Sequence, residues 1–241
     1  MSQPLRRYAA LAAGLALAVP GLAAQSPLSD PLIPDGEQSI YRIIVGDATG
    51  TVDEQVRRVT IEGTDQYLIT SQSPTSTTQV RLLRPSMAPV YARTTGNATT
   101  YRAETITTVT YSSGPPSGIT AFGLTDLRHV LRGVDFSSTA PKTIRFVDTN
   151  GGAESSQDTF SLHVTVAGTE ELKLGTRTVR AYKLELSASV GGVLALFARL
   201  FPKTYLWYSV SSPHFLAKYQ GGGGPGAAQM TMELVEYSGA W

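Results

Sequence analysis

The sequence predicts a mostly β fold: a large curved antiparallel sheet or half-open β-barrel with one or two short helices. Two observations predict this. About a dozen short segments alternate apolar and polar residues with a period of two. Turn residues, chiefly Gly, Pro, Asn and Asp, separate these segments at close intervals. A sheet with so many strands curls or closes on itself, so we expect a curved sheet and not a small sandwich.

The first half of the chain predicts a meander of antiparallel strands. On the first strand, Tyr41, Ile43 and Val45 share one face because side chains alternate along a strand. The expected strands in this half are residues 39–45, 54–61, 67–72, 79–83, 89–94 and the Thr-rich segment 99–111.

The second half resumes the same pattern after a Pro- and Gly-rich break at 112–123. The alternation is clearest in 159–166, where Phe160, Leu162, Val164 and Val166 share one face. The other expected strands are 143–147, 178–186, 204–209 and 229–237. The glycine run 221–226 is interpreted as a hairpin loop between two strands.

One short helix is expected at residues 126–132, with Thr125 as its N-cap and Gly133 as its stop. Leu127, Val130 and Leu131 fall at i, i+3 and i+4, which gives a single apolar stripe. We therefore expect this helix to cover one end of the sheet.

A second apolar segment covers residues 190–201 and ends at Pro202. Two interpretations stay open for it. The segment is either a buried plug or strand that completes the core, or a lid over an apolar cavity.

The N-terminus predicts export. Arg6 and Arg7 precede an apolar run of 11 residues, 9–19, and small residues follow up to Ala24. This is the plan of a cleaved signal peptide, and the run is shorter than the roughly 20 residues of a membrane span. We expect cleavage near Ala24, no stable transmembrane anchor, and a location in the periplasm or outside the cell. The expected organisation is signal peptide 1–24, linker or extended arm 25–36, and a single β domain 37–241.

Composition excludes several classes of function. The chain has no Cys, which removes disulfides, thiol nucleophiles and the acylated cysteine of a lipoprotein. Without Arg6 and Arg7, 18 basic residues stand against 19 acidic ones. A near-neutral chain lacks the basic surface that nucleic-acid binding demands, so we expect no nucleic-acid partner.

No motif identifies a reaction. His129, His163 and His214 are isolated in the sequence, whereas metal sites draw on clustered ligands. The chain has no Gly-x-Ser-x-Gly elbow of a serine hydrolase. We therefore expect no cofactor, no metal and no enzymatic activity; an envelope hydrolase is the third-ranked alternative.

Several short segments resemble a family of bacterial periplasmic proteins, domain of unknown function 3108. They are LRGVDF at 131–136, GTEEL at 168–172, GT at 175–176, AYKL at 181–184, KTYLWYS at 203–209 and ELVEY at 233–237. The resemblance covers about residues 36–238. Where that family has a charged cluster after the Trp strand, this chain has 210–214, Val-Ser-Ser-Pro-His. The resemblance implies a half-open barrel similar to envelope lipoprotein carriers and implies no established activity.

These observations lead to one main hypothesis and one alternative. The protein is expected to bind or carry an apolar ligand, a lipid or acylated molecule, inside the half-barrel. The alternative is a structural or assembly factor that presents a sheet edge to an envelope protein. The candidate ligand-binding residues are Val193, Leu194, Phe197, Phe201, Tyr205, Trp207, Phe215, Tyr219, Met230 and Met232.

Overall fold

A computed structural model of the chain describes residues 28–96, 104–108, 119–121, 124–147, 158–188, 203–222 and 228–239. The strands are β1 (Glu37–Val45), β2 (Ala48–Ile61), β3 (Thr64–Gln72), β4 (Ser76–Leu83), β5 (Pro89–Gly96), β6 (Glu104–Thr108), β7 (Ile119–Ala121), β8 (Lys142–Val147), β9 (Asp158–Leu174), β10 (Arg177–Ala188), β11 (Thr204–Ser209), β12 (Leu216–Gly222) and β13 (Gln229–Tyr237). One helix, α1 (Leu124–Val130), continues into a 3₁₀ turn, η1 (Leu131–Gly133).

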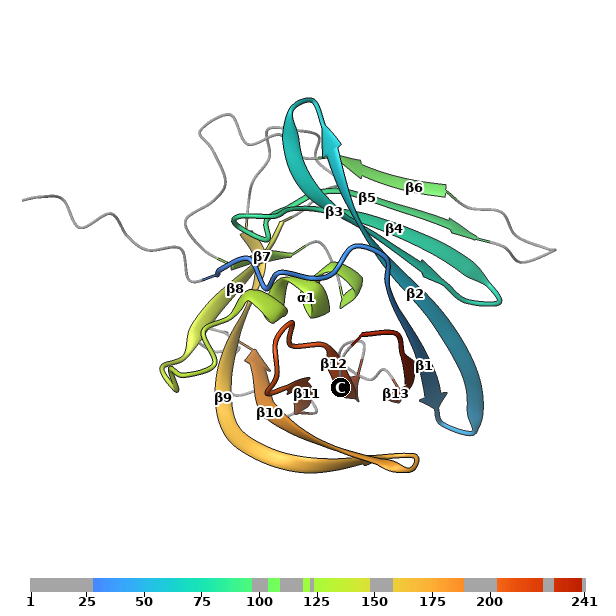
Figure 1. The fold of residues 1–241 in the computed structure, drawn as a ribbon, viewed down its shortest axis with the longest axis vertical. Helices are drawn as coiled ribbons and strands as arrows, with labels where there is room; N and C mark the ends of the chain where they lie inside the picture. The colour runs from blue at the N-terminus through green and yellow to red at the C-terminus, as the bar shows by residue number, and fades with distance from the viewer. Residues whose placement is uncertain are drawn as a thin grey trace, which may run out of the picture.

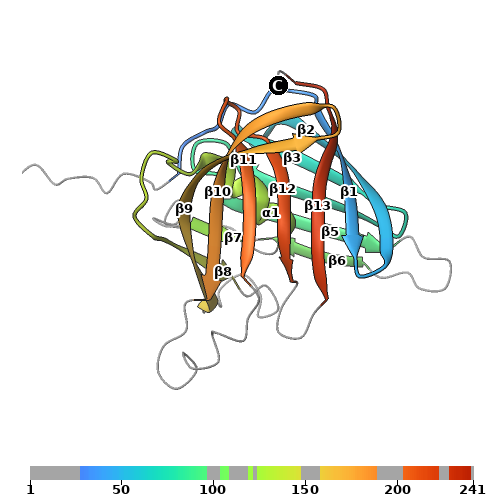
Figure 2. The ribbon, with the colours of Figure 1, turned by 90° about the horizontal axis from the view of Figure 1, so that it is seen from below.

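The described strands form one 13-stranded sheet in the order β6-β5-β4-β3-β2-β1-β13-β12-β11-β10-β9-β8-β7. Strands β1 and β13 pair antiparallel, so the first and last strands of the chain meet in the middle of the sheet. All other neighbours are antiparallel except β7 and β8, which are parallel. Because β6 and β7 end the order, the sheet is open within the described residues. It curls strongly around α1, as Figures 1 and 2 show. The predicted fold class is confirmed.

Most expected strands are confirmed, and several are longer than expected. Strands β11 and β13 have the predicted bounds. Strand β9 continues to Leu174, well past the predicted end at 166. Two strands were missed: β7 lies in the segment assigned to a break, and β12 includes Gly221 and Gly222 of the glycine run interpreted as a loop.

The predicted helix is confirmed, but its predicted N-cap is wrong. Helix α1 begins at Leu124, so Thr125 lies inside it and is not the N-cap. Leu127, Val130 and Leu131 are buried as the apolar stripe requires. The charged residues of this segment are buried too, because the helix lies inside the curve of the sheet (Figure 2).

Residues 28–36 form an arm that ties η1 to strands β2 and β3 and to Arg84, which directly follows β4. Leu28 bridges Val134, and the Ser29 amide donates to the Gly133 carbonyl at 2.8 Å. Asp30 accepts hydrogen bonds from the Tyr67 hydroxyl and, at 3.1 Å, from Arg84. The arm thereby fixes the C-terminal end of η1 against the sheet.

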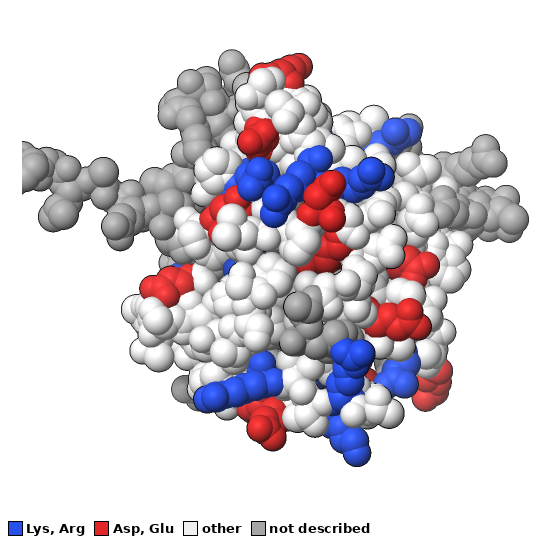
Figure 3. Space-filling model, in the orientation of Figure 1, with Lys and Arg blue, Asp and Glu red and all other residues white. Residues whose placement is uncertain are grey.

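The face of the molecule in Figure 3 carries Lys and Arg side chains intermixed with Asp and Glu. Within the described residues, no helix combines the length and the apolar character needed to cross a bilayer.

Candidate functional site

The candidate site is the inner face of the sheet, the face that packs against α1 and η1. Directly paired residues on neighbouring strands share a face. The inner face therefore includes rows such as Leu184, Leu206, Tyr219, Met232 and Ile43, which run side by side across β10, β11, β12, β13 and β1. Helix α1 crosses this face, and its contacts divide it into a polar part and an apolar part.

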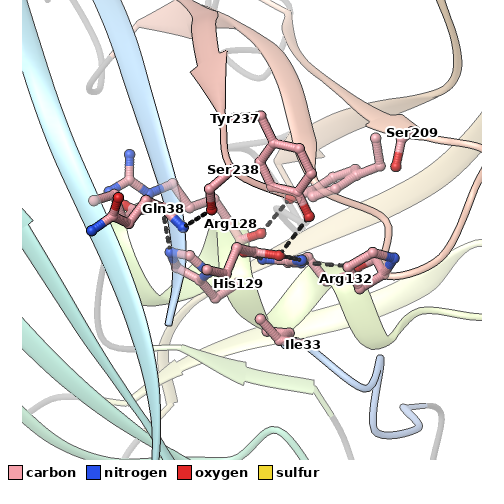
Figure 4. A network of polar contacts seen from close by, with 12 residues as sticks. Ile33, Gln38, Arg128, His129, Arg132, Ser209, Tyr237 and Ser238 are labelled. Atoms are coloured by element: carbon pink, nitrogen blue, oxygen red, sulfur yellow. Dashed lines mark hydrogen bonds and ion pairs between the residues drawn. The ribbon is translucent and has the colours of Figure 1, made fainter. Parts of the chain in front are cut away.

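Arg132 of η1 forms the first half of a buried polar network. Its guanidinium donates two hydrogen bonds to Glu37 of β1, at 2.6 and 2.9 Å. It also donates to the Pro213 carbonyl at 3.1 Å, while the Tyr237 hydroxyl donates to Glu37 at 2.7 Å (Figure 4). The Arg132 and Glu37 side chains are 3% and 2% exposed. This cluster joins η1 to the first and last strands of the chain.

Arg128 of α1 forms the second half. Its guanidinium donates to Glu54 of β2, to the Ser71 hydroxyl of β3 at 3.0 Å, and to the sulfur of Met232 at 3.3 Å. Ser71 also donates to Glu54 at 2.8 Å, and Nε2 of His129 lies 3.0 Å from the other Glu54 oxygen. One carboxylate thus gathers three partners from the helix and the neighbouring strand.

The electrostatics of this network keep its charges in place. Burial acts to raise the pKa of Glu54, but Arg128, His129 and Ser71 together lower it well below its usual range. For Arg132, burial acts to lower the pKa, yet Glu37 raises it above its usual value. Two arginines therefore face two carboxylates, and each buried charge has a partner of opposite sign.

The tyrosines around the network stay neutral. Burial raises the pKa of Tyr41, and the neighbouring Glu54 raises it further. Burial, followed by Glu37, likewise raises the pKa of Tyr237. The Tyr208 hydroxyl donates to the Arg128 carbonyl at 2.7 Å. The phenols of Tyr237 and Tyr208 thus donate hydrogen bonds, the first to the charged Glu37 and the second to the helix.

The order of contacts is not that of a catalytic triad. A triad places the histidine between the serine and the carboxylate. Here Glu54 lies between Ser71 and His129 and contacts both. All three residues are buried, so the arrangement holds the helix to the sheet and presents no nucleophile to solvent.

Beyond the network, the inner face becomes apolar toward the strand ends where β1 stops and β13 begins. Tyr219 and Met232 are buried there beside the helix. Ile43, Met230 and Leu162 are half-buried, and Val45 is 38% exposed. Ile43, Val45, Met230 and Leu162 are called the apolar rim below. It lies on the side of Met232 away from the charged groups.

The structure separates the sequence-predicted site residues into three groups. Tyr219, Met230 and Met232 lie on the inner face, and Phe215 packs against Tyr237, with ring centroids 4.3 Å apart. Tyr205 and Trp207 alternate with the inner-face residues Leu206 and Tyr208, so they point to the opposite, outer face. Val193, Leu194, Phe197 and Phe201 lie outside the described residues.

Trp207 is the centre of an outer-face cluster. Its indole N–H donates to Glu170 of β9, and the ammonium groups of Lys183 and Lys218 lie 5.1 and 5.8 Å from its ring centroid. Lys218 also bonds Glu233 at 2.9 Å. Although it faces outward, Trp207 is buried under these long side chains. The cluster ties the β9–β10 hairpin to the central strands.

The other two histidines have separate neighbours. Nδ1 of His163 lies 3.4 Å from the Thr143 hydroxyl, and Nδ1 of His214 lies 2.9 Å from the Ser209 carbonyl oxygen. The His214 ring packs on Phe136, whose ring also stacks on Tyr182. Within the described residues, no group of three or more His, Cys, Asp or Glu is placed to hold a metal ion.

Sequence reasoning missed the buried network. Its one signal was the pair Arg128 and Arg132, four residues apart and therefore on one face of a helix. On a short amphipathic helix that face is expected in solvent. The acidic partners, Glu37 and Glu54, lie more than 70 residues away, and no local pattern connects them to the helix.

Neither a protein-family model nor a curated protein matches the sequence. Among solved structures, the chain is similar to a β-barrel-like protein of domain of unknown function 1849 from Brucella abortus, with 9% identity, TM-score 0.48, and coverage of 84% of this chain and 97% of that one. It is also similar to a protein described as a candidate lipoprotein from Parabacteroides distasonis, with 9% identity, TM-score 0.34, and coverage of 88% and 97%. A third is a candidate exported protein with a YmcC-like fold from Bacteroides fragilis, with 8% identity, TM-score 0.34, and coverage of 89% and 100%. The resemblance to domain of unknown function 3108 stays a prediction.

Proposed function

We propose that the protein is an exported, non-enzymatic carrier that holds an apolar chain, from a lipid or an acylated molecule, against the inner face of its sheet. The N-terminal sequence supports export, since Arg6, Arg7 and the apolar run 9–19 have the plan of a cleaved signal peptide. The curled sheet supports binding, because half-open barrels present a concave surface to a ligand.

The apolar rim is the observation that carries this proposal. Ile43, Val45 and Met230 occupy inner-face positions, where a packed core would bury them, yet each keeps part of its surface exposed. Burying apolar surface is worth roughly 25 cal/mol per Å², so a bound acyl chain gains free energy by covering the part of each side chain that stays exposed. Methionine at 230 and 232 suits a flexible chain because its side chain adapts to irregular shapes.

The polar network sets the inner limit of this binding surface. The sulfur of Met232 contacts Arg128 at 3.3 Å, so apolar and charged surfaces meet at that residue. An acyl chain entering from the strand ends gains contacts as far as Met232 and Tyr219. Further insertion would bring it against buried charges, which are already paired.

Two features support a binding function over a catalytic one. The histidine with a carboxylate partner, His129, is buried and lies against Glu54 instead of Ser71. Glu54 is bonded to both Ser71 and Arg128, so these polar groups are engaged within the protein, and the apolar rim is the surface offered to a ligand.

The proposal is tested by titrating the purified mature protein with a fatty acid that carries an environment-sensitive fluorophore. Val45→Glu places a charge in the apolar rim and should weaken binding by about tenfold or more. Val235→Glu is the matched control, because Val235 is 53% exposed and lies at a bulge in β13 outside the inner face. It should leave binding unchanged.

Native mass spectrometry of gently purified protein gives an independent measurement. We expect co-purified lipid in the wild type and less in Val45→Glu. No probe binding to the wild type, or an equal loss in both variants, would contradict a ligand site at the rim.

A further inference from the structure

The β9–β10 hairpin projects beyond the end of β11. Strand β10 pairs with β9 from Arg177 to Ala188, but with β11 only from Ala181 to Leu186. One further backbone bond follows, from the Val210 amide to the Arg180 carbonyl at 2.9 Å. Among the described residues, no strand continues along β10 from Arg180 to Arg177 on that side.

The backbone at Thr178 is therefore available for strand pairing. Backbone groups of successive strand residues point alternately to the two neighbouring strands. Because the Arg180 carbonyl points toward the β11 side, the N–H and C=O of Thr178, two residues earlier, point the same way. Such an edge is a ready template for another strand.

A hollow of about 580 Å³ lies along this edge. Its volume is within the range of binding pockets for small ligands. It is lined by Arg177, Thr178, Val179, Arg180, Ser209, Val210 and Ser211. Val179 is buried, while Arg177, Thr178 and Arg180 are exposed. The hollow thus combines an open backbone edge with the exposed guanidinium group of Arg180.

The charge at this end of the hairpin favours an anionic partner. Lys173, across from Thr178, adds a third positive side chain to Arg177 and Arg180, and Glu171 stands across from Arg180. Glu170 is engaged by Trp207 and Lys183. Figure 3 shows Lys and Arg side chains along the lower part of the molecule, where the hairpin lies in Figure 1, with Asp and Glu among them.

We propose that this edge is a docking site for a short extended peptide with acidic side chains, which adds as a strand beside β10. Main-chain bonds to Thr178 supply affinity, and Arg180, whose side chain lies on the same face of β10 as that of Thr178, selects acidic side chains. The segment of β10 from Arg177 to Arg180 is about 13 Å long, so four extended residues of a peptide are enough to lie along it. This peptide-binding activity is separate from the proposed ligand site on the inner face.

The experiment uses a fluorescein-labelled pentapeptide of alternating Val and Glu, with amidated C-terminus, and the full mature protein. Binding is followed by fluorescence anisotropy, and the amide resonance of Thr178 is followed by NMR. The comparison peptides carry Lys in place of Glu, or N-methyl groups at alternate amides. N-methylation removes the ladder donors and keeps the charges.

We expect the acidic peptide to bind, to shift the Thr178 resonance, and to lose about tenfold in affinity in Arg180→Glu. Arg57→Glu, the same charge change at an exposed position of β2 that does not line the hollow, should change affinity less than about twofold. Equal binding of the Lys peptide, or an N-methylated peptide that binds as well as its parent, would overturn the proposal. The proposal would also be overturned if the protein did not bind the peptide but bound anionic phosphatidylglycerol vesicles, with this binding lost in Arg180→Glu.

Discussion

The ion pair between Arg132 and Glu37 provides a direct test of how α1 and η1 are held. Both side chains are almost fully buried, and the two hydrogen bonds between them are 2.6 and 2.9 Å long. Replacing Arg132 by Met leaves the Glu37 carboxylate in the interior with the Tyr237 hydroxyl as a hydrogen-bond donor but without its cation. Breaking a buried pair in this way costs about 3–5 kcal/mol, because a buried charge remains uncompensated.

For a chain of this length, a loss of 3–5 kcal/mol lowers the midpoint of thermal unfolding by about 6–20 °C. The free energy of unfolding is measured by urea titration with circular dichroism. The double variant Arg132→Met with Glu37→Met should be less destabilised than Arg132→Met alone. Replacing both members of a buried pair by apolar side chains of similar size removes the uncompensated charge.

Arg42→Met is the matched control. Arg42 of β1 bonds Glu233 of β13 at 2.7 Å, a distance close to that of the buried pair, but the two side chains are 52% and 25% exposed. An exposed pair is worth about 0–1 kcal/mol. If Arg132→Met lowers the free energy of unfolding no more than Arg42→Met does, the buried ion pair does not stabilise this part of the fold as we infer.

Three further predictions follow from the same region. Gly133→Ala should lower the free energy of unfolding, measured in urea, by about 1–3 kcal/mol, because the added Cβ would clash with the Ser29 carbonyl oxygen. Gly50→Ala is the control: its Cβ meets open space, so this variant should not be destabilised. Asp30→Ala should lower the free energy of unfolding by about 1–3 kcal/mol, because it removes the acceptor for three hydrogen bonds, from the Leu32 amide, the Tyr67 hydroxyl and Arg84. Faster proteolysis of the arm would show this loss. Because the pKa of Glu54 is lowered in the folded protein, the stability that Glu54 contributes is complete above about pH 4.5 and is lost as the pH falls. Glu54→Gln should therefore flatten the decline of the urea midpoint between pH 7 and 3. Parallel curves of urea midpoint against pH for the wild type and the variant would contradict this.

The strands of the sheet could be predicted from the sequence because the alternation of apolar and polar residues along a strand is a local property. Met230, Met232 and Leu234 share a face in the structure as their spacing predicts, and Tyr182, Leu184 and Leu186 do the same. The extension of β9 to Leu174 was missed because its second part carries charged residues on both faces. Where β9 passes Lys183 and Leu184 of β10, it has one extra residue, Ala167, and this bulge carries Glu170 onto the outer face.

The placement of the predicted ligand residues shows where local reasoning ends. Tyr205 and Trp207 are aromatic and sit in a well-predicted strand, yet they point away from Leu206 and Tyr208. Alternation shows that such pairs face opposite ways but not which face is inside. That choice depends on the helix, because the Tyr208 hydroxyl bonds the Arg128 carbonyl. It also depends on pairings between segments far apart in the chain.

The paired charges also decide how a ligand could reach the inner face. Removing α1 and η1 from the curve of the sheet would separate Arg128 from Glu54 and Arg132 from Glu37. At about 3–5 kcal/mol for each broken pair, this costs about 6–10 kcal/mol, which is comparable to the whole stability of a typical domain. Displacing the helix would therefore be nearly equivalent to unfolding. Under the proposed function, we expect an apolar ligand to enter past Val45 and Met230 at the strand ends while the helix stays in place.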